Sequence, residues 1–159
     1  MKDNAKKLII SGDFKGANSL IEKEGKDFLE QIVLELGFDE GSIGTYSFVC
    51  HLITVKESSD LHYLASELLS TALCHLPDAY SSALFHARRA LELNSEDISL
   101  KEYLLLFHDI PEQLINKEEA RDIARDIAHK SKYITVENSV KNDKEGDNTT
   151  PKIRLDADE

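Results

Sequence analysis

The histidines and cysteines of this sequence are its clearest candidates for chemistry. The six histidines are His51, His62, His75, His86, His108 and His129. The dipeptide Cys50-His51 recurs as Cys74-His75, and a thiolate with an imidazole can hold zinc. A structural zinc site needs four converging ligands, whereas neighbours on a helix point about 100° apart. We therefore expect no metal site and interpret the cysteines as buried thiols beside partly exposed imidazoles.

A cysteine and a histidine can also form a nucleophile–base pair. Neither cysteine lies in a glycine-rich oxyanion loop or a strained turn that would support such a pair. The sequence also lacks a glycine-rich phosphate loop, a His-Glu-x-x-His motif and a calcium-loop pattern. We predict a binding protein without a cofactor, and a small hydrolase that uses a histidine site is the least favoured alternative.

Two stretches are strongly acidic. Residues 22–40 carry seven carboxylates against two lysines, and residues 92–112 carry six against one, so each nets −5. Such runs are usually solvated helix faces, but they can also form a surface that attracts and selects a basic partner. The predicted contacts of that surface are Glu30, Glu35, Asp39, Glu40, Glu96, Asp97, Glu102 and Asp109.

Arginines and tyrosines offer further contact groups. Arg88 and Arg89 form one guanidinium cluster, and Arg121 and Arg125 form another. We interpret them as surface partners of Glu92 and Asp122, and an anchor for a partner's carboxylate or phosphate is the alternative. Four tyrosines are possible interface anchors, although core packing with the hydroxyl at the rim is favoured: Tyr46, Tyr63, Tyr80 and Tyr103.

The charge and composition exclude several classes of protein. The chain has 159 residues, a formal net charge of −11 and 41 % hydrophobic residues. A core of ordinary size is therefore expected, in one domain. The negative charge argues against direct binding of nucleic acid or of an anionic membrane surface.

Two cysteines make no disulfide framework, and the longest apolar stretch, residues 103–107, is far too short to cross a membrane. No signal peptide is recognised. We expect a cytoplasmic protein with reduced thiols.

The elements that would position these groups are helices. Apolar stripes at helical spacing predict helices over 3–11, 14–24, 26–36, 42–56, 60–75, 77–94, 95–108 and from Asn116 onward. Asp13, Ser95 and Asn116 are the expected N-caps, with Ser59 or Asp60 before the fifth helix. Gly37 is expected to end the third helix in a left-handed conformation, and Pro77 to lie in the first turn of the sixth. A strand is the alternative for residues 42–56, which are rich in β-branched residues.

Short links between helices favour antiparallel neighbours. We therefore predict an all-α domain over residues 1–133, with about seven or eight helices stacked as repeat-like hairpins. Residues 134–159 are expected to form a disordered acidic tail, because they hold too little apolar surface to offset ordering entropy. That tail holds 4 of the 19 basic and 7 of the 30 acidic residues, a net of −3, which leaves −8 on the domain.

Small residues at helical spacing suggest a known type of hairpin. Ala83, Ala87 and Ala90 with Leu91, followed by Glu92-Leu93-Asn94-Ser95, resemble the second helix of a tetratricopeptide repeat, in which small residues let two helices approach closely. Ser95 stands where the repeat commonly has proline, and a strict 34-residue period is absent. The resemblance implies stacked hairpins, which form binding surfaces more often than active sites.

A second resemblance is carried by LHYLASELL (61–69), ALFHARRALEL (83–93) and SLKEYLL (99–105) with Phe107. These segments, about a third of the chain, resemble small bacterial immunity proteins encoded beside polymorphic or contact-dependent toxins. The resemblance implies a cytoplasmic inhibitor that binds one cognate toxin, often a nuclease, and it transfers no site residues. The alternative function is a repeat-like scaffold or adaptor that binds a peptide or protein in a helical groove.

Overall fold

The computed structural model describes the backbone of residues 1–145 and the side chains of residues 1–135. This part of the chain is all-α, with eight helices and no strand, so the predicted fold class is confirmed and residues 42–56 do not form the alternative strand. The helices are α1 (Lys2–Ile10), α2 (Phe14–Ile21), α3 (Lys26–Glu40), α4 (Ile43–Val55), α5 (Ser59–Ser70), α6 (Ala79–Leu93), α7 (Ile98–Asp109) and α8 (Lys117–Glu145).

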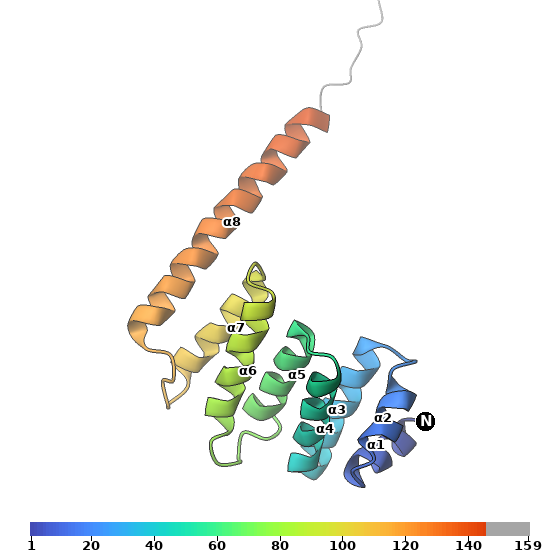
Figure 1. Cartoon of the computed structure of the whole chain (residues 1–159). Helices are drawn as coiled ribbons and strands as arrows, with labels where there is room; N and C mark the ends of the chain where they lie inside the picture. The colour runs from blue at the N-terminus through green and yellow to red at the C-terminus, as the bar shows by residue number, and fades with distance from the viewer. Residues whose placement is uncertain (146–159) are drawn as a thin grey trace, which may run out of the picture.

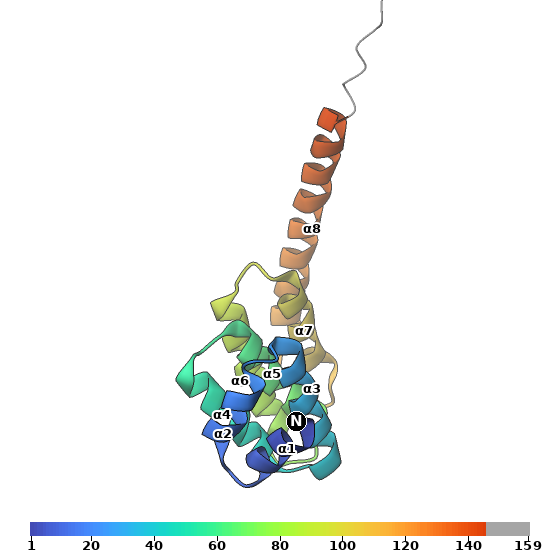
Figure 2. The same cartoon turned by 90° about the vertical axis from the view of Figure 1, so that its right-hand side faces the viewer.

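Consecutive helices pair as hairpins that stack into a row (Figure 1). The α5–α6 pair has the most extensive contact, and α3 packs on both α4 and α5. The first turns of α8 pack against α7, and the helix then projects away from the stack, as the turned view also shows (Figures 1 and 2). Among the described residues, no helix combines the length and the apolar character that crossing a bilayer requires.

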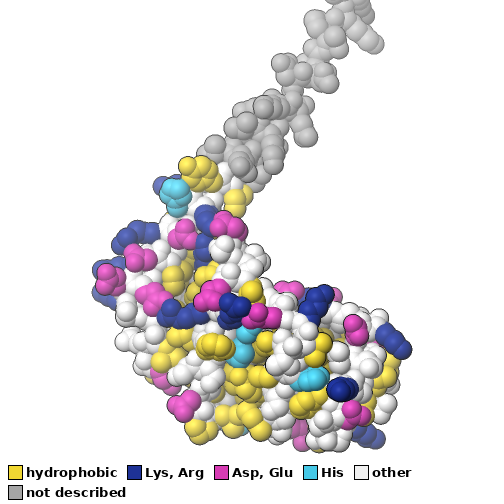
Figure 3. All heavy atoms as spheres, viewed as in Figure 1, with side chains coloured by type: hydrophobic (Ala, Val, Ile, Leu, Met, Phe, Trp, Pro, Cys, Tyr) yellow, Lys and Arg dark blue, Asp and Glu magenta, His cyan; other side chains and the backbone are white. Residues whose placement is uncertain are grey.

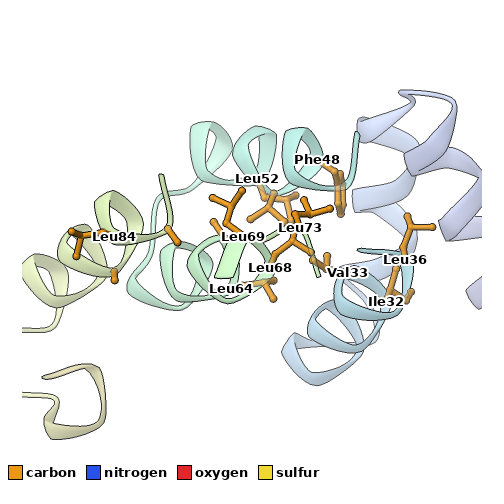
Figure 4. Close-up of a cluster of buried hydrophobic side chains, with 14 of the residues drawn as sticks. Ile32, Val33, Leu36, Phe48, Leu52, Leu64, Leu68, Leu69, Leu73 and Leu84 are labelled. Atoms are coloured by element: carbon orange, nitrogen blue, oxygen red, sulfur yellow. The ribbon is translucent and has the colours of Figure 1, made fainter. Parts of the chain in front are cut away.

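The centre of the core lies where α3, α4 and α5 meet (Figure 4). Val33 from α3, Phe48 from α4 and Leu68 from α5 are completely buried there. Leu73, in the turn after α5, is also completely buried, and Phe14 places its ring 5.6 Å from that of Phe48. These contacts join helices that are distant along the chain, so burial of their apolar stripes holds the stack together.

Gly37 does not end the third helix, as the sequence suggested. α3 continues to Glu40, and Gly41 is the left-handed residue, with φ of 58°. Gly37 is instead a packing residue, because a Cβ there would lie 2.5 Å from Leu68 Cδ1 and 3.1 Å from Ala72 Cβ. The missing side chain lets α3 approach α5 closely.

Gly37→Ala is expected to lower the free energy of unfolding by about 1–2 kcal/mol, because the added methyl overpacks a closed contact by more than the helix gains in propensity. The matched control is Gly44→Ala near the start of α4, where the nearest atom is the Ser42 hydroxyl at 3.3 Å. That variant should change the free energy of unfolding by less than about 1 kcal/mol in either direction, because the gain in helix propensity is offset by a close contact with the Ser42 hydroxyl that caps α4. Urea unfolding of both variants measures the difference, and equal effects would contradict the packing role.

Several helix ends differ from the predicted ones. Asp13 caps α2 as expected, and the Asn116 side chain accepts a hydrogen bond from the amide of Glu119 at 2.9 Å. Asp97, not Ser95, caps α7 by accepting from two amides, because its carboxylate reaches both. Ser58 caps α5, one residue before the predicted positions. α5 ends at Ser70 rather than near residue 75, and Pro77 precedes α6, which starts after Asp78, a residue in the left-handed conformation.

The structure places α8 across the expected boundary at residue 134, since the helix continues to Glu145. Ala120 on its predicted inward face is buried, and Ile123 and Ile127 are half-buried. Ala124 and Ala128 are exposed, because α8 leaves the stack and no other helix within residues 1–145 covers that side. The rest of the predicted tail, residues 146–159, lies outside the described residues.

Candidate functional site

Two of the predicted partner-binding carboxylates on α3 are engaged within the protein. Glu35 lies 2.6 Å from Lys2 Nζ and 3.3 Å from Lys6 Nζ, and Asp39 lies 3.1 Å from Lys6 Nζ. The two lysines hold the pKa of Glu35 below its usual range, mainly through the hydrogen bond from Lys2. These carboxylates therefore attach α1 to α3.

Two predicted carboxylates near α7 also have internal partners. Glu96 accepts a hydrogen bond from Lys130 of α8 at 2.6 Å, which lowers the pKa of its carboxyl group. Asp97 caps α7. Lys101, largely buried, makes an ion pair with Asp126, a second link from this region to α8.

The other four predicted carboxylates, Glu30, Glu40, Glu102 and Asp109, make no ion pair with any side chain in residues 1–135. They come from α3 and α7, on either side of α5 in the stack (Figure 1). On the face in Figure 3, acidic and basic side chains are interspersed and do not form a continuous acidic surface. Glu30 lines a hollow in which apolar side chains also meet.

Two adjoining hollows lie along α3 and α5. The larger, about 420 Å³, also touches α2, α4 and the α4–α5 loop; the smaller, about 100 Å³, lies mostly between α3 and α5. Both are lined by Lys26, Leu29 and Leu61. We call the two together the α3–α5 groove. An ion pair of 2.8 Å between Lys26 and Asp60 joins the two helices at the groove.

One end of the groove is acidic and aromatic. Glu30 and Tyr63 line the smaller hollow, and Glu67 lies one helical turn beyond Tyr63 on α5. Burial raises the pKa of Glu67, and the charge of Glu30 raises it further. The Oε2 atom of Glu67 is buried and has no hydrogen-bond partner among the described residues. A buried carboxylate oxygen without a partner is costly. Glu67 itself lines neither hollow, so the carboxylate that the groove offers to a donor from outside is that of Glu30.

Sequence reasoning overlooked Glu67. A signal was present in the spacing of Asp60, Tyr63 and Glu67, which places all three on one face of α5. The decisive feature, the burial of the carboxylate beside Glu30 of another helix, depends on tertiary packing.

The tyrosines support the helix interfaces. Tyr103 of α7 packs edge-on against Tyr63, with ring centroids 5.0 Å apart. Its hydroxyl lies 3.0 Å from the hydroxyls of both Ser66 and Ser70 on α5. Tyr103 therefore fixes α7 against α5 and holds the ring of Tyr63 beside Glu67.

A hydrogen-bonded network centred on a buried pair of histidines lies between α4, α5 and α6. His62 and His86 are each only 4 % exposed, and their Nδ1 atoms are 2.8 Å apart. The Tyr46 hydroxyl lies 2.9 Å from His86 Nε2, and Glu57 Oε1 lies 3.0 Å from His62 Nε2. Arg89 completes the network with two bonds to Glu57, at 2.7 and 3.0 Å. We call these five residues the Tyr46–Arg89 network.

The charge of Glu57 determines the direction of every bond in the network. Arg89 and then His62 lower the pKa of Glu57 to about 2, so near neutral pH it is a carboxylate and only accepts. His62 must then donate from Nε2, which leaves its Nδ1 as the acceptor for the Nδ1–H of His86. His86 Nε2 in turn accepts the Tyr46 hydroxyl proton. In this arrangement every nitrogen of the two rings has a partner. Burial, and after it the electrostatic interaction with His62, lowers the pKa of His86 to about 4.

The other groups considered for chemistry are dispersed. In the described residues, no three His, Cys, Asp or Glu side chains are grouped to hold a metal ion. Both cysteines are free; Cys50 is half-buried, whereas Cys74 is exposed, because α5 ends before it. The predicted partners Glu92 and Asp122 do pair with arginines, Glu92 with Arg89 at 2.9 Å and Asp122 with Arg125 at 3.0 Å, whereas Arg88 pairs with Glu119 at 2.9 Å.

The fold and the groove define an all-α protein built from stacked helical hairpins. No family model, curated protein or solved structure matches the chain.

Proposed function

We propose that this protein is an immunity protein, a non-catalytic cytoplasmic inhibitor that binds and occludes a basic toxin, such as a nuclease domain, through the acidic end of the α3–α5 groove. The observation that carries the proposal is that Glu30, which has no ion-pair partner in residues 1–135, lines the smaller hollow together with Tyr63, with the carboxyl group of Glu67 nearby. An arginine or lysine of a partner would donate to the Glu30 carboxylate, and charge-assisted bonds of this kind are strong. The Tyr63 ring adds a face on which a cation can rest.

The overall charge supports a basic protein partner. The net charge of −11 favours encounter with a cationic surface, and it disfavours direct binding of nucleic acid or of an anionic membrane. Carboxylates that occupy a nuclease cleft would replace the phosphates that the cleft binds. The resemblance of residues 61–107 to immunity proteins selects toxin inhibition among the binding functions.

The direct test is coexpression with the polypeptide encoded by the gene next to this protein's own. Cells should survive production of that polypeptide when this protein is present, and the two should copurify. A neighbour that is no toxin, or a toxin that neither binds nor is neutralised, would overturn the proposal.

The site is tested by charge-matched variants. Glu30→Gln with Glu67→Gln removes two charges from the groove, and Glu24→Gln with Glu118→Gln removes two from exposed positions. The groove variant should weaken binding of the toxin at least about thirtyfold, because the partner's cation is left buried and unpaired. The control should change affinity less than about threefold. Association should also slow as salt rises, because charges are screened beyond about 8 Å at physiological ionic strength.

The larger hollow favours a second candidate, a scaffold or adaptor that binds a peptide. Its volume of about 420 Å³ and its lining of Ile21, Leu29, Leu52, Val55 and Leu61 fit the apolar side chains of a bound segment. A scaffold predicts retention of such a peptide and no toxic neighbour, so the coexpression experiment separates the two functions.

A further inference from the structure

The Tyr46–Arg89 network is connected to one wall of the α3–α5 groove. Glu57 lies in the α4–α5 loop between Lys56 and Ser58, and both of these neighbours line the larger hollow, as does Val55. At the start of α5, the Ser59 hydroxyl is bonded to the carbonyl of Ala90 on α6 at 2.9 Å. Lys56 is bonded to the carbonyl of Leu52 on α4 and Ser58 caps α5, so the bonds of Glu57 to His62 and Arg89 are what attach the middle of the loop to the buried histidine pair and to α6.

We propose that this network is a proton-sensitive latch on the α4–α5 loop. The network fixes the loop while the imidazoles of His62 and His86 together carry no more than one extra proton. It releases the loop when a second extra proton binds to the pair. The inference that the latch regulates binding rests on the proposed function of the groove. The latch itself is a property of the free protein.

A first extra proton can be accommodated without breaking a bond. His62 would then donate from both nitrogens, to Glu57 and to His86 Nδ1. His86 would donate from Nε2 to the Tyr46 oxygen. The Tyr46 hydroxyl proton can turn toward Cys50, which follows one helical turn later on α4. The direction of the bonds beyond His62 reverses, and every group keeps a partner.

A second extra proton has no acceptor. Both Nδ1 atoms would carry hydrogens that point at one another across 2.8 Å, so the contact between His62 and His86 must break. The groups that face the pair are Tyr46 and Cys50 from α4, Glu57 from the loop, and Arg89 with its partner Glu92 from α6. His86 is enclosed by Tyr46 and Phe85, whereas the Glu57 side chain is 39 % exposed. The bonds of Glu57 are therefore the ones that can break, and the α4–α5 loop moves when Glu57 moves.

The experiment is an NMR titration of the free full-length chain from pH 7.5 to 3.5, which follows the histidine rings and the backbone amides. The amides of Glu57 and Ser58 should shift together with the His86 ring, at a midpoint near the His86 pKa of about 4. The amides of Ile32 and Leu68 in the core should not move in that step. The proposal would be overturned if the His86 ring titrated while the amides of Glu57 and Ser58 stayed in place. It would also be overturned if the loop and core amides all shifted in a single transition.

Two variants test the causal link, and either is sufficient. His86→Asn should abolish the loop transition, whereas the matched control His75→Asn, at an exposed position, should retain it. His62→Asn keeps the His86 ring but removes its neighbour's charge, so the ring should titrate at higher pH and the loop should no longer follow it. Persistence of the loop transition in these variants would assign it to other groups. None of these measurements uses a partner, so failure of the latch and failure of the proposed function are independent results.

Discussion

Phe48→Ala is expected to lower the free energy of unfolding by about 3–5 kcal/mol, the largest effect of any substitution considered for this protein. Phe48 is completely buried where α3, α4 and α5 meet, and its ring contacts that of Phe14 from α2. Truncation removes the apolar area that joins these helices and leaves a cavity that the surrounding helices can fill only in part. Urea unfolding followed by circular dichroism measures the change.

The matched control for this substitution is Phe38→Ala. Phe38 is 66 % exposed near the end of α3, so its loss should change the free energy of unfolding by no more than about 0.5 kcal/mol. A loss of similar size in both variants would show that the centre of the stack is not at Phe48.

Acidification from pH 6.5 to pH 4 is expected to lower the free energy of unfolding by about 2–3 kcal/mol through His86. In the unfolded chain, His86 takes up a proton near its ordinary pKa of 6.5, whereas in the fold its pKa is about 4. Between these values the unfolded state binds more protons, so stability falls as the pH falls, and the contribution is constant below pH 4. The full shift of the His86 pKa, from 6.5 to about 4, would correspond to about 3 kcal/mol of stability. The expected loss is smaller, because the network is in contact with water at Glu57.

The pH dependence of His86 can be separated from that of the carboxylates. Glu57 has its pKa lowered to about 2, so its stabilising effect is present above pH 4.5 and is lost as the pH falls toward 2. In urea unfolding at pH 7, 5.5 and 4.5, Glu67, whose pKa is raised by burial, contributes with the opposite sign, so the contribution of His86 is the difference between the wild type and His86→Asn. His86→Asn should be less stable at pH 7 and show a flatter profile, whereas His75→Asn should follow the wild type. An unchanged profile in His86→Asn would contradict the assignment.

Features that depend on neighbouring residues were predictable from the sequence. The apolar stripes at helical spacing placed all eight helices, because burial of one face is what makes a short helix stable. Asp13 and Asn116 were recognised as caps because a cap bonds to amides two or three residues away. Glu92 and Asp122 were recognised as partners of the arginine clusters, and in the structure each lies three residues from its arginine on the same helix.

Features that depend on another helix were decided by the tertiary structure. The residues around Gly37 in the sequence are compatible both with a helix end and with a close helix contact. The contact with Leu68 and Ala72, which belong to α5 and the turn after it, decides for the second. Glu35 resembled a free surface carboxylate until α1 placed Lys2, 33 residues away, against it. Glu67 resembled an ordinary helical glutamate until packing buried one of its oxygens without a donor.

The histidines show the same division most clearly. The sequence by itself determined that six imidazoles lie on or beside amphipathic helices, and it marked the Cys-His dipeptides as the pairs to consider. The structure instead joined His62 to His86 across 24 residues and His86 to Tyr46 across 40. Helix formation is governed by contacts within a few residues, which a sequence pattern records. The partner of a buried polar group is set by which helix faces meet in the stack, and only the folded chain contains that information.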